Sequence, residues 1–176
     1  MSESSRKHKS EAPLRLTFAI FTVSTSRYQK LKKGESVKDE SGDLIESVLK
    51  SAGHTIGFRK VISDDRRMIQ ESIRNSLAAP NLDAVILCGG TGITKSDVTI
   101  ETVLPFLEKT LPGFGETFRS LSFDEIGSAA ILTRTIAGVA KGKAFFCLPG
   151  SRDAAKLCVE RLISTEAGHI VKHARE

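Results

Sequence analysis

The residues best suited to chemistry form a glycine-rich segment that is followed by an acid. The segment consists of Gly89, Gly90, Thr91 and Gly92. It comes directly after the apolar run 83–88, and Asp97 lies five residues beyond it. Glycines let backbone N–H groups approach a phosphate or carboxylate closely, and a helix start adds a favourable dipole. The segment indicates an anionic ligand such as a nucleotide, with an ordinary tight turn as the alternative.

This segment differs from the standard nucleotide-binding motifs. A P-loop requires G-x-x-x-x-G-K-S/T, and here Lys95 and Ser96 are present but Thr94 occupies the position of the second glycine. The dinucleotide fingerprint G-x-G-x-x-G also fails, because Lys95 replaces its last glycine. A P-loop NTPase is therefore excluded.

Carboxylates are the second chemical feature. Asp64 lies just past the apolar run 54–62, Asp97 closes the glycine-rich segment, and Glu101 follows one helical turn later. Nucleotidyl transfer uses a divalent cation to offset phosphate charge, and Mg²⁺ typically takes one or two carboxylates plus substrate phosphates. Asp64 and Asp97 could supply these carboxylates, and the alternative is that both are helix caps.

Two more polar loops follow apolar runs, at residues 24–27 and 148–152. In an open parallel sheet, ligands collect at the carboxyl ends of the strands. We therefore expect these two loops and the glycine-rich segment to lie on the same rim of a sheet.

The hydrophobic pattern predicts the elements that position these loops. Apolar runs predict strands at residues 14–23, 54–62, 83–88, 134–140 and 143–148, and Lys141-Gly142 predicts a hairpin turn. Helices are predicted to begin after residues 39–43, after 64–65, after 97 and after 151, and a further helix is predicted at 114–126. Residues 24–38 are predicted to form a long loop. Alternating strands and helices predict an α/β three-layer sandwich, a mostly parallel sheet with helices on both faces and an antiparallel edge strand.

Composition narrows the class of protein. The length of 176 residues suits one domain, predicted at 14–170 after a flexible polar tail at 1–13. The net charge of +5 is scattered and aromatic residues make up 6%, which argues against nucleic-acid binding.

No apolar run reaches about 18 residues and no secretory signal precedes the domain, so we expect a cytoplasmic protein without membrane contact. The three cysteines form no C-x-x-C pair and the four histidines show no ligand spacing, which argues against a His/Cys zinc site.

The run from Cys88 to Thr99, which contains GGTG-x-x-x-x-D-x-T, resembles the MoaB/Mog family of molybdenum cofactor biosynthesis, a fold family shared with the gephyrin G domain. Further matching pieces are Thr22-Val23-Ser24, Asp39 with Ser41-Gly42, PGFGE-x-x-R at 112–119, and Leu148-Pro149-Gly150-Ser151. The resemblance covers about residues 14–165 and is nearer to the MoaB branch.

This resemblance implies a molybdopterin-binding domain with molybdopterin adenylyltransferase activity. The reaction consumes ATP as a substrate with Mg²⁺ and needs no tightly bound organic cofactor. Asp64 and Asp97 fall at the positions of the family's two functional aspartates, although a slip of one residue would exchange Asp64 for Asp65. The ligand contacts that the resemblance implies are Ser24, Gly89, Gly90, Thr91, Gly92, Glu116, Gly150 and Ser151.

The resemblance also implies partners. It suggests a homo-trimer or hexamer and a downstream metal-insertion protein that receives the product. The alternative function is a non-catalytic carrier that binds molybdopterin without chemistry.

Overall fold

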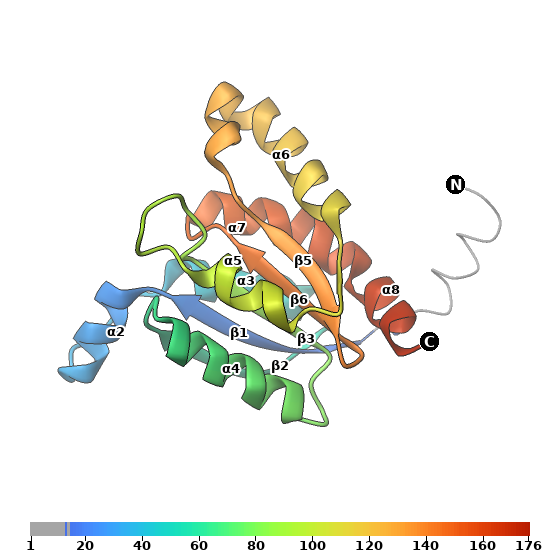
Figure 1. Ribbon diagram of the computed structural model, residues 1–176, viewed down its shortest axis with the longest axis horizontal. Coiled ribbons are helices and arrows are strands. Elements are labelled where there is room, and N and C mark those ends of the chain that lie inside the picture. The colour runs from blue at the N-terminus through green and yellow to red at the C-terminus, as the bar shows by residue number, and fades with distance from the viewer. Residues whose placement is uncertain (1–12, 14) are drawn as a thin grey trace.

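The computed structural model describes residue 13 and residues 15–176, and it contains a six-stranded sheet in the order β2-β1-β3-β6-β5-β4 (Figure 1). The strands are β1 (Thr17–Val23), β2 (Thr55–Ile62), β3 (Ala84–Cys88), β4 (Lys109–Thr110), β5 (Ile136–Ala140) and β6 (Lys143–Leu148). The first four strands in this order are parallel, whereas β5 is antiparallel to β6 and β4 is antiparallel to β5. The predicted sheet with an antiparallel edge is confirmed.

Helices cover both faces of the sheet. The α-helices are α2 (Thr25–Lys32), α3 (Glu40–Ser51), α4 (Arg66–Ala78), α5 (Thr99–Val103), α6 (Pro112–Ile126), α7 (Arg152–Cys158) and α8 (Ser164–Arg175). The 3₁₀ helices are η1 (Leu104–Phe106) and η2 (Gly127–Leu132), and the π-helical turn η3 (Val159–Ile163) joins α7 to α8.

Alternation along the central strands explains the three layers. Phe18 and Ile20 of β1 belong to a core cluster with α3, α6, α7 and α8, whereas Ala19 and Phe21 belong to a second cluster with α4 and α5. Successive side chains of a strand point to opposite faces, so a strand that is apolar at nearly every position must be covered on both sides. The predicted three-layer sandwich is confirmed.

Two short elements differ from the sequence prediction. Residues 25–32 form the helix α2 inside the segment that was expected to be a loop. None of its residues is buried, so the helix has no apolar face that periodicity could reveal. The strand β4 has two exposed residues and is too short to give an alternating pattern.

The expected tail at residues 1–13 lies outside the described residues, apart from residue 13. Within the part of the chain that the structure describes, no helix has both the length and the apolar character required to cross a membrane.

Candidate functional site

The candidate site lies at the carboxyl ends of the four parallel strands. Ser24, Gly89 and Pro149 directly follow β1, β3 and β6, and Asp64 is the second residue after β2. The backbone N–H of Gly89 donates to the carbonyl of Leu148 at 3.0 Å, which fixes the β3 and β6 loops side by side. Parallel strands thus bring together loops that lie far apart in the sequence, as expected.

Two glycines of the loop after β3 cannot be replaced without strain. Gly89 has a φ of +112° and Gly90 a φ of +63°, a region that side chains rarely adopt. A Cβ on Gly89 would lie 2.2 Å from the carbonyl oxygen of Val23, and a Cβ on Gly90 would lie 2.4 Å from Oδ2 of Asp64. The absence of a side chain therefore allows the Asp64 carboxylate to rest against the loop backbone.

Although Asp64 and Asp65 are adjacent, their side chains accept hydrogen bonds from different parts of the structure. Oδ1 of Asp64 accepts a hydrogen bond from the Val98 N–H at 3.3 Å, at the far end of the glycine-rich loop. Oδ1 of Asp65 instead accepts from the Met68 N–H at 3.0 Å and caps α4. The structure therefore turns Asp64 toward the loop and Asp65 away from it.

Electrostatics set Asp64 apart from its neighbour Asp97. Burial raises the pKa of Asp64, and the negative charges of Asp97 and Glu101 raise it further against the opposing Val98 hydrogen bond. The Thr94 hydroxyl and N–H donate to Oδ2 of Asp97 at 2.6 and 2.9 Å, and they lower the pKa of Asp97. Asp97 therefore closes the loop as an ionised carboxylate.

Arg134 is a residue of the site that the sequence did not single out. Its Nη1 donates to the Gly92 carbonyl at 2.9 Å, and its guanidinium also pairs with Glu101. The Arg134 pair lowers the pKa of Glu101, although burial opposes this effect. Arg134 precedes β5 and Glu101 lies in α5, so no local motif links them.

A pocket of about 340 Å³ opens beside this loop. Its walls are residues 90–92, Asp97, residues 132–134, Pro149 and Gly150. Thr91 is buried in the wall, and a Cβ on Gly150 would lie 3.3 Å from Cα of Gly89. The volume falls in the usual range for small-ligand sites, roughly 300–1,000 Å³.

Five predicted site residues lie outside the lining of this pocket, namely Asp64 and Gly89, which are described above, and Ser24, Ser151 and Glu116. Ser24 caps α2 by accepting from the Arg27 N–H, and Ser151 caps α7 by accepting from the Ala154 N–H. Glu116 lies on α6, exposed, beside a separate hollow of about 300 Å³ that Arg119 and Thr135 also line.

Asp39 organises the support behind the site. It is buried, caps α3 through the Gly42 N–H, and accepts from Thr22 Oγ1 at 2.8 Å and Arg59 Nη2 at 2.6 Å. Burial acts to raise the pKa of Asp39, but these hydrogen bonds and the Arg59 charge outweigh it and hold the pKa below its usual value. Two residues on, Ser41 donates to the Gly150 carbonyl at 3.0 Å, so this capping motif also holds the pocket wall.

The donors at the site suit a hard cation such as Mg²⁺. Asp64 and Asp97 offer carboxylate oxygens, and a cation would offset the burial and the repulsion by Asp97 and Glu101 that together raise the pKa of Asp64. In the described part of the chain, no three His, Cys, Asp or Glu side chains converge to hold a metal ion. A bound Mg²⁺ would thus require phosphate oxygens from a substrate as well.

The fold and the loop cluster define the chain as a molybdopterin-binding domain. The family described as "Probable molybdopterin binding domain" matches residues 19–169, and the chain belongs to this family. Within it the chain is similar to the MoaB proteins of molybdenum cofactor biosynthesis. Molybdenum cofactor biosynthesis protein B of Bacillus subtilis is 42% identical over 172 residues, which are 97% of each chain.

Two further comparisons agree with this placement. The molybdopterin adenylyltransferase of Pyrococcus furiosus is 40% identical over 174 residues, which are 97% of this chain and 98% of that protein. A crystal structure of a molybdenum cofactor biosynthesis protein B superposes with a TM-score of 0.84 at 39% identity, covering 94% of this chain and 99% of that one. The family predicted from the glycine-rich motif is confirmed.

Proposed function

We propose that the protein transfers the adenylyl group of ATP to molybdopterin within molybdenum cofactor biosynthesis. The observation that carries this proposal is that the Asp64 and Asp97 carboxylates both lie against one glycine-rich loop, beside a pocket that this loop lines. A site built from carboxylates and backbone N–H groups suits phosphate transfer, because charge neutralisation and positioning supply most of that catalysis. The relatives named as adenylyltransferases support the same reaction.

In the proposed reaction, an oxygen of the terminal phosphate of molybdopterin attacks the α-phosphorus of ATP. The bond between the α-phosphorus and the oxygen that bridges to the β-phosphorus breaks, and pyrophosphate leaves. Backbone N–H groups of Gly90, Thr91 and Gly92 hold the ATP phosphates, whereas the N–H of Gly89, which the sequence also predicted for this role, already donates to the Leu148 carbonyl. Arg134 keeps this loop in place through the Gly92 carbonyl. Asp64 and Asp97 would hold Mg²⁺, which would offset negative charge on the phosphates.

The remaining contacts would line the nucleotide or the pterin part of the site. Gly150 lines the pocket next to Gly89 of the glycine-rich loop, and Ser24 and Ser151 lie on the same rim. Glu116 would act from the neighbouring hollow on α6, either on the ligand or on the loop near it.

The direct test mixes the full-length protein with molybdopterin, ATP and Mg²⁺ and assays adenylylated pterin and pyrophosphate. We expect both products in equal amounts, and we expect neither when Mg²⁺ is omitted. Tight molybdopterin binding without product would contradict the enzyme and favour the carrier. A protein that binds neither molybdopterin nor ATP would contradict both functions.

The proposal includes two kinds of partner. The adenylylated product would pass to a downstream metal-insertion protein. We also propose assembly of the chain with copies of itself, as a trimer or hexamer, through apolar side chains that α6 and η2 expose.

A further inference from the structure

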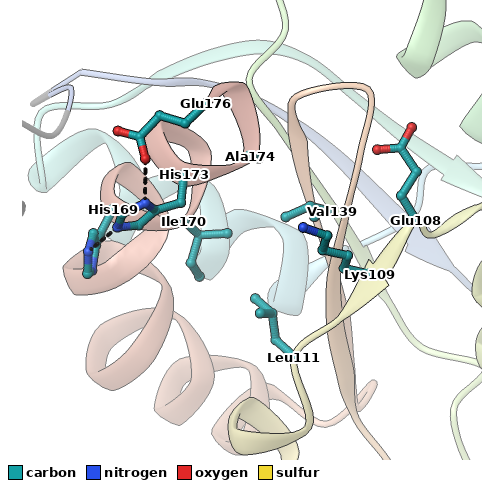
Figure 2. Close-up of a pocket in the computed structure, with 9 residues that line it drawn as sticks. All are labelled: Glu108, Lys109, Leu111, Val139, His169, Ile170, His173, Ala174 and Glu176. Carbon is teal, nitrogen blue, oxygen red and sulfur yellow. Dashed lines mark hydrogen bonds and ion pairs between the residues drawn. The ribbon is translucent and has the colours of Figure 1, made fainter.

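The C-terminal helix α8 carries a pair of histidines away from the pocket described above. His169 and His173 lie one helical turn apart, with their Nε2 atoms 2.9 Å from each other (Figure 2). Their ring centroids are 4.7 Å apart, so the two rings converge at the Nε2 atoms. The sequence analysis did not single out this pair, but residues four apart share one face of a helix.

The other nitrogen of each ring faces a carboxylate. Nδ1 of His173 lies 2.8 Å from Oε2 of Glu176, and Nδ1 of His169 lies 3.5 Å from Oε2 of Glu166. An ionised carboxylate only accepts hydrogen bonds, so the Nδ1 of His173 carries a proton and its Nε2 is the ring nitrogen that faces His169. The two Nε2 atoms lie within hydrogen-bond distance of each other at 2.9 Å, and the same approach places both nitrogens within reach of one metal ion.

We propose that His169 and His173 bind a divalent transition-metal ion through their Nε2 atoms. An imidazole nitrogen lies about 2.0–2.1 Å from such an ion. At the observed separation, an ion equidistant from both nitrogens makes an N–metal–N angle of about 90°. That angle fits neighbouring positions of a square-planar or octahedral site, which Cu²⁺ and Ni²⁺ prefer, better than a tetrahedral zinc site.

The carboxylates are the support that a metal-binding histidine uses. A ligand histidine usually donates its second N–H to a carboxylate, which fixes the ring and increases its basicity. Glu176 occupies this place for His173, as Figure 2 shows. A carboxylate next to the Nδ1 atom of each ring is therefore what a metal-binding pair of histidines requires, in addition to the proximity of the two rings.

The surroundings leave room to complete the coordination. A pocket of about 410 Å³ lies beside the pair, with Leu111 and Ile170 among its apolar lining and Glu108 and Lys109 on its far side (Figure 2). Among the described residues no third metal-ligating side chain joins the pair, so waters or an added carboxylate would fill the remaining positions. Cys88, Cys147 and Cys158 are all buried and do not offer a competing site.

The test is calorimetric titration of the full-length protein with CuCl₂, NiCl₂ and CoCl₂, together with the visible absorption of bound Cu²⁺. We expect one equivalent to bind, most tightly for Cu²⁺ and least tightly for Co²⁺. His169→Ala and His173→Ala should each weaken binding by at least about tenfold, and Glu176→Gln by about tenfold through the loss of ring support. The matched control is Glu160→Gln, which neutralises an exposed acid of η3 and should leave the affinity unchanged.

Two results would overturn the proposal. The first is the absence of saturable binding, in which case the two rings share a proton instead. The second is unchanged affinity and an unchanged Cu²⁺ spectrum in the double variant His169→Ala/His173→Ala. Circular dichroism of each variant verifies that the fold is intact, so that loss of binding reports on the ligands.

Discussion

At the scale of single residues, the adjacent acids Asp64 and Asp65 provide a matched pair for testing the chemistry. Asp64→Asn keeps the shape but removes the charge that the proposed reaction needs, so we expect the adenylylation rate to fall about 100-fold or more. Asp65→Asn should leave the rate unchanged, because Asn caps a helix about as well as Asp. Rates are measured with saturating ATP and molybdopterin. An equal loss in both variants would contradict the assignment of Asp64.

Replacement of Asp64 should lower the activity but increase the stability of the fold. The raised pKa of Asp64 means that the folded protein binds this proton more tightly than the unfolded chain does. The carboxyl group therefore loses its stabilising contribution as pH rises from the ordinary value of 3.8 through the raised pKa, and the ionised form opposes folding at neutral pH. We expect Asp64→Asn to unfold at a higher urea concentration than the wild type at pH 7.

The pH dependence of the stability difference between Asp64→Asn and the wild type provides the control for this prediction. The stability advantage of Asp64→Asn should shrink as pH falls below the raised pKa, where the wild-type carboxyl is neutral. Urea unfolding of both proteins at several pH values measures this difference. A variant that is less stable than the wild type at pH 7 would show that the hydrogen bond to Val98 matters more than the burial of charge.

At the scale of elements, Arg59 joins the edge strand β2 to the start of α3. Its guanidinium bonds to Asp39 and pairs with Asp43 and Glu46, and the Asp39 side chain is only 7% exposed. Arg59→Leu would leave the Asp39 carboxylate without its cation, and we expect a loss of about 2–3 kcal/mol in the free energy of unfolding.

Lys50 provides the matched control for Arg59, because it pairs with the same Glu46 on the exposed side of α3. Lys50→Gln should cost no more than about 0.5 kcal/mol, as is usual for an exposed pair of this spacing. Both values come from urea denaturation at neutral pH. Similar losses in the two variants would mean that the Asp39 network stabilises the fold no more than a surface pair does.

The loop after β3 depends on Arg134 in another way. A guanidinium can bond to the Gly92 carbonyl and Glu101 together, and a lysine ammonium lacks this planar fork. Arg134→Lys should raise the KM for ATP about three- to tenfold, which corresponds to the loss of one hydrogen bond. The melting temperature should stay near that of the wild type. A fall in melting temperature with an unchanged KM would assign Arg134 to the fold alone.

The sequence predicts elements with strong periodicity and misses those without it. β3 and β6 are buried at every position, so their apolar runs are unmistakable. α2 buries none of its residues and leaves no such trace. The site divides in the same way, because Gly90 and Asp97 belong to one local motif, whereas the contact of Arg134 with Glu101 spans 33 residues and exists only after folding.

At the scale of the whole molecule, the most conspicuous surface is the apolar end of α6 with η2. Helix α6 extends away from the sheet in Figure 1. Its surface is formed by Phe123, Ile126, Ile131 and Leu132, which are between 55% and 82% exposed. Such a patch usually marks a protein interface. A second copy of this chain is the occupant that the family resemblance implies.

We therefore expect the double variant Phe123→Asp/Ile131→Asp to convert an oligomer into a monomer, because burying two carboxylates in an apolar contact is costly. Size-exclusion chromatography with light scattering measures the mass. The control is Leu31→Asp, which places the same charge on an exposed apolar residue of α2 and should leave the mass unchanged. Because Phe123 and Ile131 are already exposed in the single chain, the double variant should stay folded, and its melting temperature verifies this. A wild-type protein that is monomeric at micromolar concentration, or a double variant that keeps the oligomeric mass, would show that this surface does not mediate self-association.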